Sequence, residues 1–115
     1  MASGNNPNLD PVWYREATFG ASNAAVPAGA GTTVIKAGGP GVLGRVVITT
    51  AGSTGNLTLY DSASGASGTI LAVIPGASNV AAAVVGAVYD LRMPVLNGIT
   101  AVGAANSPAV TVSYL

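Results

Sequence analysis

Side chains that could carry out chemistry are few in this sequence, and none lies in an arrangement typical of an active site. The acids are Asp10, Glu16, Asp61 and Asp90, and the chain has neither Cys nor His. A thiolate nucleophile, the commonest metal ligand and the usual general base are therefore all missing. The many Ser residues have no evident base, and turn formation explains them better than nucleophilic catalysis. We expect no enzyme activity, no metal ion and no cofactor.

Two patterns suggest chemistry but fit structural explanations better. Asp61 and Asp90 could act as paired carboxylates in glycoside hydrolysis, but each follows a Tyr at a predicted strand end, where a charge protects a sheet edge. Residues 39–44 match the G-x-G-x-x-G string of dinucleotide-binding loops. That loop must follow a strand and open a helix, whereas these glycines lead into a predicted strand.

The composition indicates a protein that associates through uncharged surfaces. Hydrophobic residues make up 50% of the 115 residues and charged residues only 7%, with no net charge; soluble proteins average about 25% charged. The four basic residues, Arg15, Lys36, Arg45 and Arg92, are scattered singly, so we expect no binding to nucleic acid or to an anionic membrane. Residues 62–89 and 93–115 are uncharged, but their Pro, Asn and Ala content argues against membrane spans.

Short runs of β-branched and apolar residues, separated by Gly, Pro, Asn and Ser, predict an all-β fold. We expect about seven or eight short strands in an antiparallel, jelly-roll-like β-sandwich. The strands are predicted at residues 32–37, 45–50, 56–60, 69–74, 84–93, 98–103 and 109–115. Residues 69–74 read as a buried strand, residues 93–94 as a break in the ladder, and the last strand should place Val110, Val112 and Tyr114 on one face.

The domain boundary is predicted near residue 20. Residues 1–20 are expected to form an extended N-terminal arm, and residues 21–115 a single β-sandwich domain, with residues 20–31 as a linker or irregular edge segment. Within the arm, residues 12–19 hold the only Trp and the only Phe of the chain. They could anchor a partner, because aromatic residues and Arg concentrate in interfaces, or form a first strand tucked under the sandwich.

The clearest strand pair is predicted between residues 42 and 61. Two β-branched runs flank residues 51–55, a loop suited to an antiparallel hairpin, and the register would set Arg45 opposite Asp61. Alternation then gives this hairpin two apolar faces, and we infer that another subunit or a larger partner covers one of them. The two faces are Val47, Leu57 and Leu59, and Val46, Ile48 and Tyr60.

These two features together define a predicted interface with a partner or a second subunit. Its residues are Val12, Trp13, Tyr14, Arg15 and Phe19 from the arm, and Val46, Ile48 and Tyr60 from the hairpin.

Residues 41–115 resemble a group of small β-sandwich virion proteins of tailed bacteriophages. The best-matched pieces are TLYD at residues 58–61 with the Ser, Ala and Gly loop behind it, LNGI at residues 96–99, and VTVSY at residues 110–114. These are strand-and-turn patterns rather than a chemical signature.

The resemblance implies a structural role on a virus particle. Proteins of this kind include capsid cement or decoration proteins, commonly homotrimers seated where subunits of the major capsid protein meet. The expected location is the capsid surface, after assembly in the host cytoplasm. The resemblance also allows a head-fibre or tail module that binds a host receptor or a carbohydrate.

Overall fold

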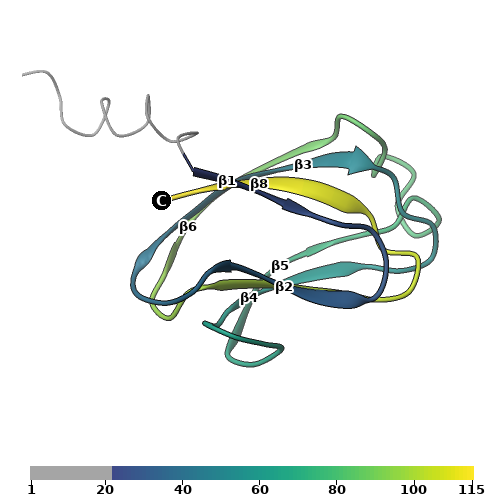
Figure 1. Ribbon diagram of the computed structural model, residues 1–115. Coiled ribbons are helices and arrows are strands. Elements are labelled where there is room, and N and C mark those ends of the chain that lie inside the picture. The colour runs from purple at the N-terminus through teal and green to yellow at the C-terminus, as the bar shows by residue number, and fades with distance from the viewer. Residues whose placement is uncertain (1–21) are drawn as a thin grey trace, which may run out of the picture.

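The computed structural model describes residues 22–115, which form a β-sandwich of two four-stranded antiparallel sheets (Figure 1). The predicted all-β sandwich is therefore confirmed. The strands are β1 (Ser22–Val26), β2 (Gly31–Lys36), β3 (Gly41–Thr50), β4 (Leu57–Asp61), β5 (Thr69–Ile74), β6 (Val88–Val95), β7 (Ile99–Gly103) and β8 (Ala109–Tyr114).

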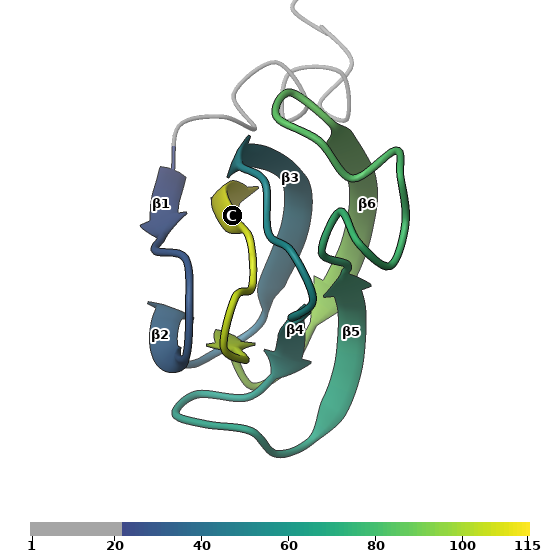
Figure 2. The ribbon, with the colours of Figure 1, turned by 90° about the vertical axis from the view of Figure 1, so that its right-hand side faces the viewer.

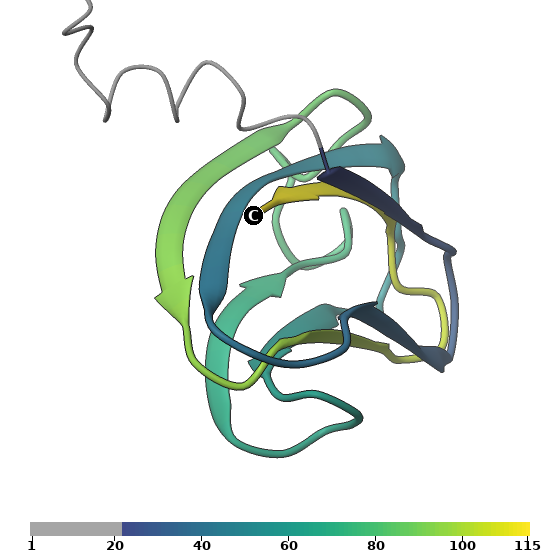
Figure 3. The same cartoon turned by 60° about the vertical axis from the view of Figure 1, so that its left-hand side comes forward.

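Within the described chain, nearly every connection passes from one sheet to the other. The β3 sheet has the order β1-β8-β3-β6 and the β4 sheet the order β2-β7-β4-β5, so that only β4 and β5 follow each other within one sheet. The short β1–β2 connection sets these two edge strands on one side of the sandwich, and β5 and β6 are the edges of the opposite side (Figure 3).

The predicted hairpin between β3 and β4 is wrong, because the two strands belong to different sheets. β3 pairs with β6 and β8, whereas β4 pairs with β5 and β7. Arg45 consequently pairs with Asp90 of β6 and not with Asp61. Residues 51–56 connect the two strands and are numerous enough to span the roughly 10 Å between packed sheets.

Four of the six apolar residues that suggested two buried hairpin faces line one shared core, whereas Val47 and Tyr60 face outward. Val46 and Ile48 of β3, exposed by only 0% and 1%, belong to the same cluster as Leu57 and Leu59 of β4. Each set is covered by the opposite sheet, so this core needs no second subunit. The other core residues are Val26, Ile35, Leu43, Ile74, Ala83, Val95, Ile99, Ala101, Val110 and Val112.

β6 begins and ends later than the strand predicted at residues 84–93. It runs to Val95 and includes Pro94, which pairs with Val42 instead of breaking the ladder. Because β6 is an edge strand, a residue without a backbone N–H can be accommodated there. Residues 75–87 form a turn-rich connection between β5 and β6.

Two other segments also differ from expectation. The segment predicted as a linker or irregular edge contains a regular edge strand, β1, paired with β8, and the strand predicted to be buried is β5, an edge strand. The alternation predicted for β8 is confirmed, since Val110 and Val112 are buried and Tyr114 is partly buried. In residues 22–115 no helix has the length and apolarity needed to cross a membrane.

Candidate interaction surface

Asp61, at the end of β4, fixes the turn between β6 and β7. Its carboxylate accepts hydrogen bonds from the backbone N–H of Asn97 at 2.8 Å and from that of Leu96 at 3.1 and 3.2 Å. These bonds, that of Asn97 first, hold the pKa of the Asp61 carboxyl below its ordinary value of 3.8. The Asp61 carboxylate therefore serves to hold the turn between β6 and β7.

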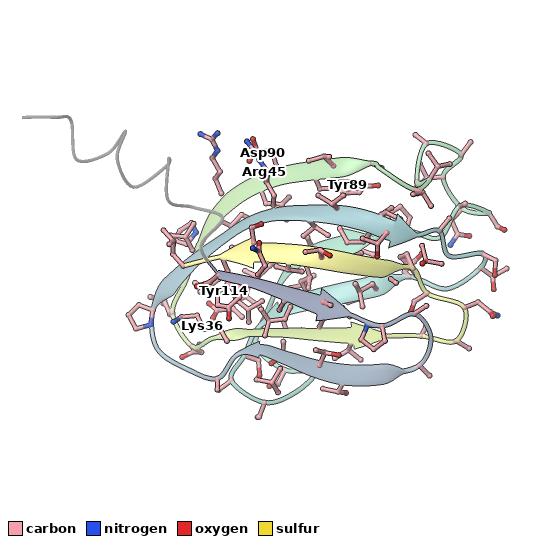
Figure 4. All side chains as sticks on the ribbon, turned by 45° about the horizontal axis from the view of Figure 1, so that its top comes forward. Lys36, Arg45, Tyr89, Asp90 and Tyr114 are labelled. Atoms are coloured by element: carbon pink, nitrogen blue, oxygen red, sulfur yellow. The ribbon has the colours of Figure 1, made fainter. Side chains whose placement is uncertain are left out.

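Asp90 forms a small charged network on the outer face of the β3 sheet. The Nε of Arg92 lies 3.2 Å from one carboxylate oxygen, and the Nε of Arg45 lies 3.9 Å from the other. Figure 4 shows Arg45 and Asp90 projecting together away from the core. The three side chains are about half exposed, so solvent screens these ion pairs and they add little stability.

The two acids of the described strands do not form a catalytic or metal-binding pair. Asp61 ends β4 and Asp90 lies in β6 of the other sheet, each engaged in its own contacts. Nowhere in residues 22–115 do three Cys, His, Asp or Glu side chains gather in a way that could hold a metal ion.

The outer face of the β4 sheet is uncharged. Leu57 and Leu59 are buried, so the alternation of side chains along β4 places Thr58 and Tyr60 on the outer face. The strand pairing then aligns each of them with outward-facing residues of the neighbouring strands, which gives two rows of side chains across the sheet. The rows are Val34, Thr100, Tyr60 and Ile70, and Thr32, Val102, Thr58 and Val73. Thr100 is buried, and its hydroxyl donates a hydrogen bond of 2.8 Å to the carbonyl oxygen of Ser62, in the segment that follows β4.

The β5 and β6 edges lie on the same side of the sandwich (Figure 2), and exposed apolar side chains concentrate in this part of the chain. Six of the nine large hydrophobic residues exposed in the described chain lie between β5 and the start of β6. We call these six residues the lateral apolar surface: Ile70 and Val73 on the outer face of the β4 sheet, Val80, Val84 and Val85 in the connection between β5 and β6, and Val88 on the outer face of the β3 sheet at the start of β6. Ile70 is 54% exposed and Val85 64%, and residues 62–89 carry no charge.

The structure places the residues of the predicted interface in three different settings. Val12, Trp13, Tyr14, Arg15 and Phe19 lie outside the described residues. Val46 and Ile48 are enclosed in the domain's own core and have no surface to offer a partner. Tyr60 is partly exposed on the outer face of the β4 sheet, directly opposite Ile70 of the lateral apolar surface.

Sequence reasoning missed all six residues of the lateral apolar surface. The available signal was the uncharged run of residues 62–89, which overlaps two of the predicted strands but does not indicate which of their side chains stay exposed. Within this run a continuous apolar strand can be either a buried strand or an edge strand exposed on one side, and the sequence pattern is the same for both.

A shallow hollow of about 310 Å³ lies where three connections meet at one end of the sandwich. Its lining is Ala28, Gly29, Ala51, Gly52, Ser53, Asn106 and Ser107, with no aromatic side chain. The Ser107 hydroxyl donates to the Gly29 carbonyl at 3.1 Å and accepts from the Gly29 N–H at 3.2 Å. The Ser107 side chain therefore links the β7–β8 connection to the β1–β2 connection, and its hydroxyl is not free to bind a ligand.

Comparison with known proteins found no matching family model, no matching curated protein and no matching solved structure.

Proposed function

We propose that the protein is a structural, non-enzymatic component of a bacteriophage virion. It acts as a homo-oligomeric capsid cement protein that stabilises contacts between subunits of the major capsid protein. The observation that carries this proposal is the lateral apolar surface, which exposes six large apolar side chains on a chain segment without charge.

Such a surface is suited to lasting contact with other proteins. Soluble monomers rarely expose large contiguous apolar patches, and those that exist usually mark an interaction site. Lasting interfaces are apolar and resemble a domain core cut in half. The charged network of Asp90 lies on the outer face of the β3 sheet, which holds only Val88 of the six residues, so most of the lateral apolar surface can be covered while this network stays in water.

Repetition in a shell makes weak individual contacts sufficient. A micromolar contact corresponds to about 8 kcal/mol, and an oligomer that touches several capsid sites at once gains from effective concentration. Hence the lateral apolar surface need not be large in any one copy.

The alternative, a fibre or tail module that binds a receptor or a carbohydrate, has less support. Its site would need an aromatic platform or several free polar groups. The hollow between the loops has no aromatic side chain, and its Ser107 hydroxyl is bonded to Gly29, which leaves Ser53 and Asn106 as its other polar side chains.

The decisive experiment is to determine the copy number and position of this chain in purified particles by cryo-electron microscopy and quantitative mass spectrometry. Hundreds of copies at positions between capsomers support the cement function. A few copies at one vertex or on the tail overturn it in favour of the receptor-binding module.

A matched pair of variants connects the result to the lateral apolar surface. Val85→Lys should lower particle occupancy at least tenfold, because a charge would be buried in the contact. Ala25→Lys introduces the same charge at an exposed position of β1, an edge strand on the opposite side of the sandwich, and should leave occupancy unchanged. Equal occupancy of both variants would exclude the lateral apolar surface as the contact.

A further inference from the structure

The free edge of β5 carries no charge and no Pro, unlike the edges formed by β6 and β2, and it exposes large apolar side chains. Edge strands in stable monomers usually carry charges, Pro or bulges that prevent pairing with another chain. β6 carries Asp90, Arg92 and Pro94, and β2 ends in Lys36 at a register shift. β5 consists of six residues with no charge, no Pro and no Gly, and its register against β4 shifts once, between Leu59 and Tyr60. The remaining edge strand, β1, is also uncharged, but it exposes no large apolar side chain.

β5 also exposes apolar side chains beside this free edge. Ile70 and Val73 are both about half exposed and continue the uncharged outer rows of the β4 sheet. A strand added to β5 would satisfy its free backbone groups and cover these two side chains in the same step.

One stretch outside the described residues has the composition of such a strand. Residues 12–19, VWYREATF, are rich in aromatic and β-branched residues, and their two charges, Arg15 and Glu16, cancel. Eight residues in strand conformation span about 26 Å, enough to pair along all of β5.

The length of the chain determines which copy this stretch can reach. Phe19 is three Cα–Cα steps from Ser22, where β1 begins, so the two Cα atoms are at most about 11 Å apart. β1 and β5 are edges on opposite sides and in different sheets. With strands about 4.8 Å apart and sheets about 10 Å apart, a strand beyond β5 lies roughly 20 Å from β1. The chain cannot reach its own β5.

We infer that residues 12–19 of one copy add as an extra strand to the free edge of β5 in a neighbouring copy. The inference rests on the homo-oligomer of the proposed function and identifies one of its contacts. Because donor and acceptor are different surfaces, the contact is head-to-tail, and such contacts close into a ring when the rotation between copies allows it. A homotrimer is the smallest ring that can be built in this way without two-fold symmetry.

Engineered disulfides test this contact, because the chain has no cysteine of its own. Donor chains carry Ala17→Cys or Thr18→Cys, whose side chains point to opposite faces of a strand. Acceptor chains carry Ile70→Cys, Ala72→Cys or Val73→Cys. Each donor is co-refolded with each acceptor and oxidised. We expect a disulfide between donor and acceptor chains for at least one combination, identified by peptide mass spectrometry.

A single-chain control examines the competing arrangement, in which residues 12–19 fold back on β1 of their own chain. A two-residue turn at Gly20 and Ala21 would set Ala17 opposite Ala24. An intrachain disulfide in the variant with Ala17→Cys and Ala24→Cys, without any link to β5, would overturn the inference.

Truncation provides a second and independent measurement. A chain that starts at Ser22 should sediment as a monomer while keeping the β-sheet circular dichroism of the full chain. If the truncated chain forms the same oligomer as the full chain, the inference is wrong.

The two proposals fail in distinguishable ways. Cross-linking and sedimentation use purified protein and test only the contact between copies, whereas copy number in particles tests only the virion function.

Discussion

At the residue scale, one charged side chain of the described chain clearly serves the fold. It is Asp61, whose carboxylate accepts backbone hydrogen bonds from Leu96 and Asn97. The sequence pattern predicts that Asp61 is an edge charge and the partner of Arg45. The pattern could not show its actual role, since the turn that it binds is more than thirty residues away in the chain.

The stability of the protein should depend on the ionisation of Asp61. Its pKa is lowered in the folded state, so its contribution is fully present above the ordinary value of 3.8 and is lost as the pH falls through the lower folded pKa. In Asp61→Asn the neutral amide no longer provides this contribution. Urea denaturation between pH 2 and pH 6 should therefore show a flatter pH dependence for the variant than for the wild type. Parallel curves would contradict the assignment.

Truncating a core residue and a residue of the lateral apolar surface should have very different effects. Leu59→Ala removes a fully buried side chain and should lower the free energy of unfolding by about 2–5 kcal/mol. Val85→Ala removes a mostly exposed side chain and should change it by less than about 0.5 kcal/mol. Chemical denaturation of both variants checks the contrast, which disappears if Val85 is part of the core.

At the scale of elements, the edge strands differ in how they are protected. β6 has charges and a proline, whereas β5 presents a neutral apolar edge. The sequence of β5 alone could not show whether it is a buried strand or an edge strand, because this depends on which other strands pair with it in the folded sheet. The pattern of β8, with one buried and one partly exposed face, was predicted correctly because both of its faces have clear and opposite environments.

Adding a charge to β5 should separate association from folding. Val73→Lys places a charge at an exposed position of the free edge, so it should convert the oligomer to a monomer and leave circular dichroism unchanged. Thr32→Lys is the matched control, since Thr32 is an exposed residue of β2, the opposite edge of the same sheet. Analytical ultracentrifugation of both variants measures the effect, and an oligomer that survives Val73→Lys would show that β5 is not a contact.

At the scale of the whole molecule, the sequence predicted the class of fold but not how the strands are connected. Local alternation and turn residues identified most strands and therefore the sandwich. The β3–β4 pairing was predicted wrongly because neighbouring strands in a chain often pair, whereas here Val46 and Leu59 are brought together across the core by opposite sheets. The lateral apolar surface escaped prediction for the same reason, since exposure is a property of the assembled sheets.

This interleaved connectivity should make folding slow. In residues 22–115 only β4 and β5 follow each other within one sheet, so most strand pairs join distant parts of the chain. Folds dominated by such non-local pairs reach the native state in milliseconds to seconds. Stopped-flow refolding should find the main phase in this range, and a phase of microseconds would contradict the topology.

The unequal outer faces of the two sheets make the molecule a small amphiphile. One outer face carries Arg45 and Asp90, and the other presents Val34, Tyr60 and Ile70 without a charge. A free subunit should therefore adsorb at an air–water boundary with its charged sheet toward the water. Thin vitrified films of the isolated protein should show one preferred orientation, which a detergent added before freezing should remove.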